Sequence, residues 1–528
     1  MFRRSRKRVE KARHMAAMAA ATQHLDNPLT TALIAELQQA MTGHVVQYGD
    51  SSYDASRQLS NNAFQLFPQA IAYCETFADV RACLDFARKR SVALVPRSGG
   101  HSTAGFSIND GLVIDVSRLA YVVVDPGKRR AVVGAGTNFG HLNATLDDYR
   151  LHVPSGGCED VCVGGYVQGG GFGFTSREYG MNCDNVVEAL VMLADGGIVN
   201  ASEAVNAPLF WAIRGGTGNN FGIVLQVTYE LHDLWQVWGF GLRWPIAQAA
   251  EPLALMQRDY MRAGAPASLG YMTFLVYQHE TPGTPHLQPY LLMRGMYHGD
   301  RSEGLSILEP LMKTPGASLQ IDATGNYREL NQSLLEEPDA IPLVPDIGRE
   351  DKQSGYIARP LAPADWQRVI DAFLRAPNQY SVVCIEPYGG AISARAPDFN
   401  AFVHRQVDMD LFLDVFWIQE PEEERAKRYL DDFVATMKPY FNGESYQNYP
   451  RRGLPDFLRQ YFGSNLERLV GCKNIYDPAQ VFRFPQGIPL TMPGVEKAAV
   501  LALAAGPAAA AIDYEPYSPT PRPSVVSA

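Results

Sequence analysis

Two glycine-rich segments limit, more than any other feature, how this chain can fold. One spans residues 96–102, with the sequence Pro-Arg-Ser-Gly-Gly-His-Ser, and the other spans 164–173, shortly after the pair Gly157-Cys158. Glycine accepts positive φ and lets the backbone come close to a ligand, so a histidine after two glycines can be pressed against a flat molecule. Dense glycines also let backbone N–H groups approach an anionic group such as a pyrophosphate. Taken singly, each segment is equally typical of an ordinary turn or a bulged strand.

The chain is long enough for two domains, and its composition is that of a globular protein. It has 528 residues, of which 46% are hydrophobic and 10% aromatic, and one hydrophobic core seldom serves so long a chain. The net charge of −10 argues against a nucleic-acid partner, which needs a basic surface. The basic run at residues 3–8 is too local to change that expectation.

Neither end of the sequence predicts a signal peptide or a membrane span. Residues 15–21 form only a short apolar run, and residues 498–512 are too short for a bilayer and contain a Gly-Pro break. A cytoplasmic location is therefore expected, with secretion as the alternative. Seven cysteines, an odd number, argue against a disulfide scaffold. Cys158 and Cys162 lack the second ligand pair that a zinc site needs, so no metal is expected.

The order of the predicted elements places the first glycine segment at the end of a strand. A strand at 67–74, a helix at 77–89 and a strand at 91–96 form a β-α-β unit, because the apolar residues of the middle segment recur at helical spacing. Ligands bind at such strand ends in open α/β layers. Further strands are predicted at 111–116 and 131–136, and helices at 29–41 and 143–149.

Several motifs, in this order along residues 60 to 490, resemble one family of flavoproteins. They are Gly99-Gly100-His101, Cys158, the glycine segment 164–173, the segment 184–189 that enters an apolar strand, Tyr446-Gln447-Asn448-Tyr449 and Gln486-Gly487-Ile488-Pro489. Together they resemble the berberine-bridge-enzyme-like branch of the vanillyl-alcohol-oxidase flavoproteins. The resemblance implies an α+β fold of two domains of the PCMH/VAO type.

The resemblance also implies how the chain is divided. A leader and helix at 1–40 precede an FAD-binding domain at 41–231. A substrate domain at 232–440, built as an antiparallel sheet covered by helices, follows it. Residues 441–490 return to the FAD domain, and the Ala/Pro-rich tail at 491–528 is expected to be disordered.

The cofactor that the resemblance implies is FAD, held by two covalent bonds. His101 aligns with the histidine that bonds to the flavin 8α position, and Cys158 with the cysteine that bonds to C6. Two positions depart from the family pattern. Tyr166 stands where a histidine is usual, and Phe484 stands where an asparagine is usual near the pyrimidine ring of the flavin. Gln486 is then the one residue of that pair that is expected to contact the ring. The other expected cofactor contacts are Arg97, Ser98, Gly99, Gly100, Ser102, Val161, Gly164, Gly165, Gly169, Gly170, Gly171, Gly222, Ile223 and Val224.

The reaction that the resemblance implies is oxidation of an alcohol or hemiacetal, with hydride transfer to flavin N5. Tyr449 aligns with the family's tyrosine base, and Tyr446 belongs to the same motif. A free phenol is a poor base at neutral pH, so Tyr449 needs a neighbour that takes up charge. Glu386 and Asp410 both stand where the family places active-site polar groups, and alternation puts Asp410, Phe412 and Asp414 on one face of their strand. Asp410 could equally be a solvated strand end.

Substrate and acceptor follow from the same resemblance. A side chain as small as Val161 goes with oxygen access in this family, which favours an oxidase that makes hydrogen peroxide. The expected partners are O2 and a hydroxylated small molecule, first a carbohydrate or oligosaccharide, bound by a monomer or weak homo-oligomer without nucleic acid or membrane. The alternatives are a tailoring oxidase of a secondary metabolite, a dehydrogenase with another acceptor, and a flavin-retaining binding protein.

Overall fold

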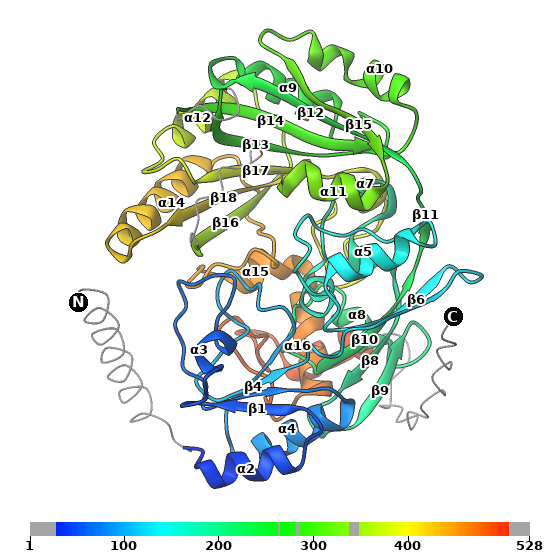
Figure 1. The fold of residues 1–528 in the computed structure, drawn as a ribbon, viewed down its shortest axis with the longest axis vertical. Helices are drawn as coiled ribbons and strands as arrows, with labels where there is room; N and C mark the ends of the chain where they lie inside the picture. The colour runs from blue at the N-terminus through cyan, green and yellow to red at the C-terminus, as the bar shows by residue number, and fades with distance from the viewer. Residues whose placement is uncertain (1–27, 262–263, 281–285, 337–347, 506–528) are drawn as a thin grey trace.

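The computed structural model describes residues 28–261, 264–280, 286–336 and 348–505, which form two lobes one above the other (Figure 1). The lower lobe contains the N-terminal residues and, in orange, the last long helices, whereas the upper lobe contains the middle of the chain. No helix in these described ranges is long and apolar enough to cross a membrane.

The lower lobe begins with a four-stranded sheet of order β1-β2-β4-β3. Its strands are β1 (His44–Gln47), β2 (Ala70–Tyr73), β3 (Leu94–Arg97) and β4 (Leu112–Asp115). Strands β2 and β3 both run parallel to β4, because helix α4 (Phe77–Arg90) makes the crossover between them. Thr76 begins α4 with a capping box to Asp79. The predicted β-α-β unit is confirmed.

A second sheet of the lower lobe is antiparallel throughout, with the order β5-β6-β10-β8-β9. Its strands are β5 (Val122–Asp125), β6 (Arg130–Gly134), β8 (Val186–Met192), β9 (Ile198–Ser202) and β10 (Ile223–Glu230). The second glycine segment lies between β6 and β8 in sequence, and includes the short helix α6 (Val163–Tyr166).

The upper lobe is one antiparallel sheet of seven strands in the order β15-β12-β14-β13-β17-β18-β16. The strands are β12 (Val237–Pro245), β13 (Leu269–His279), β14 (Leu287–Tyr297), β15 (Ser318–Gly325), β16 (Arg349–Ile357), β17 (Val382–Pro387) and β18 (Met409–Trp417). Helices α9 (Ala250–Asp259), α12 (Pro363–Phe373) and α14 (Glu423–Met437) cover its outer face (Figure 1). A separate apolar core forms there, around Trp244, Trp366 and Trp417.

The remaining helices and short strands lie outside these three sheets. They are α2 (Thr31–Gln39), α3 (Tyr53–Ser56), α5 (Phe139–Asp147), β7 (Leu151–His152), α7 (Ser176–Tyr179), α8 (Ala207–Ala212), β11 (His232–Asp233), α10 (Arg301–Met312), α11 (Tyr327–Glu336), α13 (Gly390–Ala394), α15 (Phe457–Phe462) and α16 (Leu466–Tyr476).

The expected disorder of the tail does not hold for its first part. Residues Lys497–Ala505 form helix α17, which packs on α16 with Val500 and Ala504 buried. Gly471 of α16 allows this contact, since a Cβ there would collide with the Val500 carbonyl oxygen. The apolar, alanine-rich composition therefore reflects a packed helix. Residues 1–27 and 506–528, which hold most of the predicted leader and the rest of the tail, lie outside the described residues.

Candidate active site

A cavity of about 670 Å³ is lined by the glycine segments of the lower lobe and by one face of the upper sheet. This volume is in the range of about 300–1,000 Å³ that is typical of small-molecule and cofactor sites. The sequence-predicted residues in its lining are Arg97, Ser98, Gly99, Gly100, His101, Ser102, Cys158, Val161, Gly164, Gly165, Tyr166, Gly222, Ile223, Val224, Glu386, Tyr446, Tyr449 and Gln486. Gly169, Gly170, Gly171 and Asp410 are not part of it.

His101 and Cys158, far apart in sequence, line the same cavity. His101 follows β3, where Gly100 has a φ of 74° and so needs glycine. The Nε2 atom of His101 is 2.9 Å from Oδ2 of Asp160, and this hydrogen bond lowers the pKa of the aspartate. Cys158 is exposed and is not part of a disulfide. The loop is held at its base by Arg97, whose Nε donates to Asp115 Oδ2 at 2.5 Å.

The three glycines at 169–171 pack against protein and not against the cavity. A Cβ on Gly169 would collide with Asn448, one on Gly170 with Phe402, and one on Gly171 with the Tyr166 ring. The Gly171 N–H donates to the Tyr446 hydroxyl oxygen at 2.7 Å. These glycines therefore let the C-terminal motif approach the loop, and their predicted contact with the cofactor stays a prediction.

Tyr166, which replaces the usual histidine, lines the cavity with its ring. Its hydroxyl donates to the backbone carbonyl of Phe172, and burial raises its pKa well above the ordinary value. The phenol proton is thus already engaged, so Tyr166 does not offer the donor that a histidine would offer at this position.

Unpartnered polar atoms in the lining test whether FAD fits. Both side-chain amide atoms of Asn219 and the Ser107 hydroxyl are buried without a hydrogen-bond partner among the described residues, and both residues line the cavity. A Cβ on Gly165 would meet only Ser98 Oγ, at 3.7 Å, so this stretch of backbone is open to a ligand. A long, flat molecule with many polar atoms would satisfy these groups. The lining therefore fits FAD.

Asn219 and Ser107 were missed from the sequence. Asn219 has a φ of 60° in a turn just before β10. The glycine-rich sequence around it did not distinguish it from an ordinary turn residue. Gln486, by contrast, was predicted and is fixed in place: its Nε2 donates to the Arg451 carbonyl at 2.8 Å, and its Oε1 accepts from Tyr461 at 3.3 Å.

Tyr449, which is half-buried, and Glu386, which is buried, form a hydrogen-bonded pair in the cavity. The Tyr449 hydroxyl donates to Glu386 Oε1 at 2.6 Å, which joins the C-terminal motif to strand β17. Burial raises the pKa of Glu386 to about 7, although the Tyr449 hydrogen bond and the Lys352 charge act in the opposite direction. Burial and the charge of Glu386 raise the pKa of Tyr449 well above its ordinary value.

Asp410 does not assist Tyr449. Its side chain is fully buried, so the alternative of a solvated strand end is wrong. Neither carboxylate oxygen has hydrogen-bonding geometry with a partner in the described part of the chain. Burial and then the neighbouring Glu386 charge raise the pKa of Asp410 well above its ordinary value. Of the two predicted carboxylates, the structure places Glu386 against the tyrosine.

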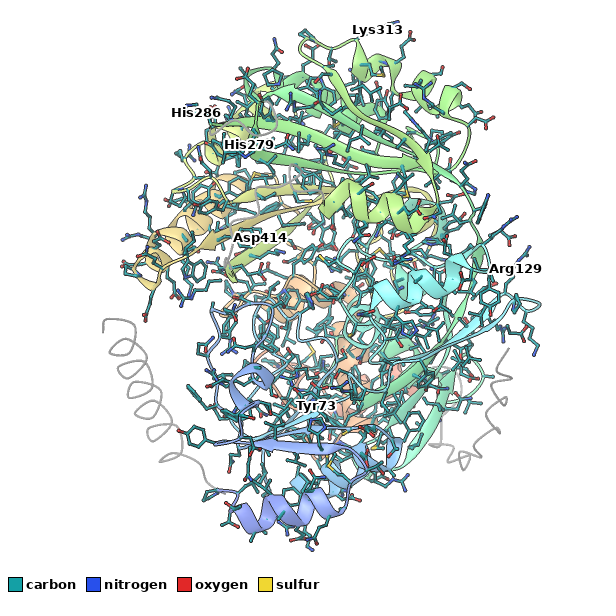
Figure 2. The ribbon with its side chains drawn as sticks, viewed as in Figure 1. Tyr73, Arg129, His279, His286, Lys313 and Asp414 are labelled. Carbon is teal, nitrogen blue, oxygen red and sulfur yellow. The ribbon has the colours of Figure 1, made fainter. Side chains whose placement is uncertain are left out.

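A second buried pair, Lys352 and Asp414, was missed. Lys352 Nζ lies 2.6 Å from Asp414 Oδ2, on the cross-strand pair that joins β16 and β18. The same nitrogen is 4.9 Å from the ring centroids of both Tyr449 and Phe412. Burial lowers the pKa of Lys352, but the charges of Asp414 and Glu350 and the hydrogen bond to Asp414 together outweigh burial and raise the pKa above the ordinary value. Figure 2 labels Asp414 in the lower part of the upper lobe, whereas Lys313 lies at its top.

Strand alternation had put Asp414 on the predicted face, but nothing in the sequence marked Lys352. Its strand carries no motif, and its proximity to Tyr449 depends on the pairing of β16 with β18.

The cavity joins glycine-rich loops of an α+β lobe to a tyrosine–glutamate pair beside an antiparallel sheet, an arrangement that fits a flavin-dependent oxidoreductase. Comparison with known proteins agrees. A model for the FAD binding domain matches residues 68–202, and one for the berberine and berberine-like segment matches residues 445–489. The chain belongs to the berberine-bridge-enzyme-like family of FAD-linked oxidoreductases.

Individual relatives match over most of the chain. It is 32% identical to the FAD-linked oxidoreductase pynB of Aspergillus niger, over 85% of this chain and 90% of that protein. It is 28% identical to a xylooligosaccharide oxidase of Thermothelomyces thermophilus, over 81% and 88%. The solved structure of BBE-like 1 from Physcomitrella patens superposes with a TM-score of 0.78 at 27% identity and covers 87% of this chain and 99% of that one. The predicted family and fold class are confirmed.

Proposed function

We propose that this FAD-linked oxidoreductase oxidises a hydroxyl-bearing carbon, an alcohol or hemiacetal, of a small molecule, and that O2 accepts the electrons. The observation that carries the proposal is the Tyr449–Glu386 pair at 2.6 Å, in the cavity that His101 and Cys158 also line. The balanced reaction converts the alcohol and O2 to a carbonyl compound and hydrogen peroxide. Bound FAD would supply the two-electron acceptor, which takes the carbon-bound hydrogen as hydride and passes its electrons to O2.

The protein's own part is to remove the hydroxyl proton. The Tyr449 oxygen accepts the substrate proton while its own proton passes to Glu386 Oε1, so no free phenolate is required. A carboxyl with a pKa of about 7 is well matched to receive a proton at neutral pH. Lys352, held over the Tyr449 ring, favours the ionised form of Glu386 from which this transfer begins.

The names of two relatives support the proposed electron acceptor and the proposed class of substrate. Two that match along most of the chain are named xylooligosaccharide oxidase and carbohydrate oxidase, the latter from Microdochium nivale, and these names support a carbohydrate donor with O2 as acceptor. Val161 lies half-buried in the lining, where a small side chain leaves a path for O2. A dehydrogenase with another acceptor is the alternative.

Two covalent bonds from the chain to FAD complete the proposal. Each would replace a C–H bond of the flavin and an N–H or S–H bond of the protein, and the two electrons released would pass through the reduced flavin to O2. Both His101 and the exposed thiol of Cys158 reach the cavity. The test is to denature the purified protein in acid and ask whether the yellow chromophore stays with the polypeptide. We expect colour to survive in His101→Ala and in Cys158→Ala and to be lost only in the double variant. Release of the flavin from the wild type would overturn the covalent assignment but would not contradict the proposed oxidation reaction.

The reaction itself is tested by peroxide release. Wild-type protein is offered a panel of alcohols and sugars in air, and then without oxygen in the presence of an artificial dye. Peroxide formation that is lost in Tyr449→Phe supports the proposal. Bleaching of the flavin with dye reduction but no peroxide would replace the oxidase by the dehydrogenase, and no bleaching with any donor would contradict both.

A further inference from the structure

The upper wall of the cavity is one face of the seven-stranded sheet, and most of that face is apolar. Cross-strand pairs align Phe274 with Cys384, and Cys384 with Phe412, across β13, β17 and β18. We call the six apolar side chains that these strands direct into the cavity the apolar wall. They are Met272, Phe274, Val382, Cys384, Phe412 and Phe416.

Four polar side chains of this face also line the cavity: Glu350, Lys352, Glu386 and Asp414. Glu386 accepts from Tyr449, and Asp414 is paired with Lys352. Two acceptor atoms, Glu386 Oε2 and Asp414 Oδ1, accept no hydrogen bond from the described residues. Polar contacts for a ligand are therefore confined to the reacting position beside Tyr449 and to the edge strand β16, whereas β13 contributes only apolar side chains to this face.

An oligosaccharide makes a different demand. Each sugar ring carries several hydroxyls, and each hydroxyl that loses water must find a new hydrogen-bond partner or be bound at a cost. Met272, Val382 and the Phe side chains supply none. Aromatic and aliphatic surfaces do gain from contact with this wall, because Phe rings stack on other rings and the Met272 sulfur packs well against a ring edge.

We propose that the part of the substrate that does not react is apolar, so that the donor is an aromatic or alicyclic alcohol and not an oligosaccharide. The inference rests on the proposed function for the position of the reacting hydroxyl, but it concerns binding to the apolar wall. It departs from the carbohydrate donor that the names of two relatives support, and it narrows the donors to the kind of small molecule on which a tailoring oxidase acts.

The test compares two sets of donors at the wild-type enzyme. The first set is cinnamyl alcohol, 2-naphthalenemethanol and cyclohexylmethanol, and the second is xylobiose, cellobiose and lactose. We expect kcat/KM from peroxide release to be at least about tenfold higher for the best alcohol than for the best sugar, a ratio that pocket contacts of this kind supply. Binding is measured in parallel as the shift in Tm that each compound causes at saturation, which does not depend on turnover.

A matched pair of variants tests the role of the wall. Val382→Gln places an amide in the apolar wall, where Val382 is only 6% exposed. Val123→Gln makes the same change on β5 at a site that is 48% exposed and outside the lining. We expect Val382→Gln to lower kcat/KM for the alcohols about tenfold and to leave the sugars unchanged or better, while Val123→Gln changes neither.

The outcomes separate this inference from the proposed function. Tm shifts with the alcohols but no peroxide and no bleaching would support the inference and overturn the proposed function. Peroxide from sugars in preference to alcohols would overturn the inference and leave the proposed function standing. The inference is also overturned if neither set shifts the Tm, or if Val382→Gln behaves like Val123→Gln. Should Val382→Gln fail to fold, the same comparison is made with Phe416→Gln, whose side chain is half-buried.

Discussion

The two walls of the cavity are built by opposite means. The lower wall uses backbone: loops with glycines such as Gly100 and Gly165 bring main chain to the cavity and carry His101 between regular elements. The upper wall uses side chains on rigid strands, with the charges of Glu386 and Asp414 paired and buried. A wall of backbone can hold a cofactor of fixed shape, whichever substrate reacts. A wall of side chains instead determines which proton is transferred and which substrate binds. Substitutions on the upper wall should therefore change chemistry, and those on the lower wall cofactor loading.

The largest effect is expected from Tyr449→Phe. The variant keeps the ring but removes the hydroxyl that accepts the substrate proton, so kcat/KM should fall about 10²- to 10⁴-fold, the usual contribution of general base catalysis. Flavin content, read from the visible spectrum, should stay as in the wild type. Tyr48→Phe, at a side chain that is 48% exposed, is the matched control. Equal loss of flavin and activity would mean that the group beside Glu386 also holds the cofactor, and the division of roles between the two sides of the cavity would fail.

Glu386→Gln should remove the pH dependence that the wild type shows near neutrality. Wild-type kcat/KM is expected to rise as the pH increases through about 7, because Glu386 must be ionised to receive the proton. The variant should be slower by about 10²-fold, with this limb absent. A limb that persists in the variant would assign the titration to another group.

The raised pKa of Glu386 should also make the free energy of unfolding depend on pH. The pKa of Glu386 is raised from its ordinary value of 4.5 to about 7 in the folded state, so its contribution to the free energy of unfolding is present in full below about pH 4.5 and is lost as the pH rises through 7. We expect the Tm of the wild type to fall relative to that of Glu386→Gln across this interval. Parallel Tm curves for the two proteins would contradict the raised pKa.

Lys352 and Asp414 should shift the activity limb in opposite directions. The groups around Glu386 are Tyr449 and Tyr446 from the C-terminal motif, Lys352 from β16, Asp410 from β18, and Cys384 and Tyr388 close to it in sequence. Asp414 acts on Glu386 through Lys352, with which it is paired. Lys352→Met removes the cation and should move the limb about one pH unit upward. Asp414→Asn leaves that cation uncompensated and should move the limb downward by a similar amount. Lys352→Arg should stay near the wild type, and two shifts of the same sign would point to misfolding.

The smallest effect is expected from two alanines in the second glycine segment. Gly165→Ala adds a methyl group that meets only Ser98, so the Tm should stay within a few degrees of the wild type while flavin content falls. Gly170 has a φ of 121° and lies against Phe402, so Gly170→Ala should lower the stability by about 1–3 kcal/mol. Denaturant unfolding and the absorbance ratio of flavin to protein measure both. Equal flavin loss in the two variants would show that the segment is not divided into a cavity-facing part and a packing part.

The lower wall was largely predictable and the upper wall was not, for a physical reason. Glycine, a preceding strand and a following histidine act within a few residues, so 96–102 is readable without knowledge of the fold. The charges around Tyr449 meet only because β16, β17 and β18 pair in one register, and a shift of one residue would turn Lys352 away. Glu386 was found because of the family resemblance, whereas Lys352 had no such guide. The sequence did not separate the glycines at 169–171, which pack against protein, from those that line the cavity, because dense glycines look alike in both places.

The site is completed by residues from the C-terminal part of the sequence. Tyr446, Tyr449 and Gln486 all come from residues 445–489, which fold back onto loops that were synthesised several hundred residues earlier. At the usual pace of translation, about 5–20 residues per second, both walls leave the ribosome some seconds before the residue that removes the proton. A nascent or truncated chain that stops before residue 445 would thus present the cofactor loops without the base. On the proposed function, oxidation can therefore begin only when residues 445–489 have closed the site.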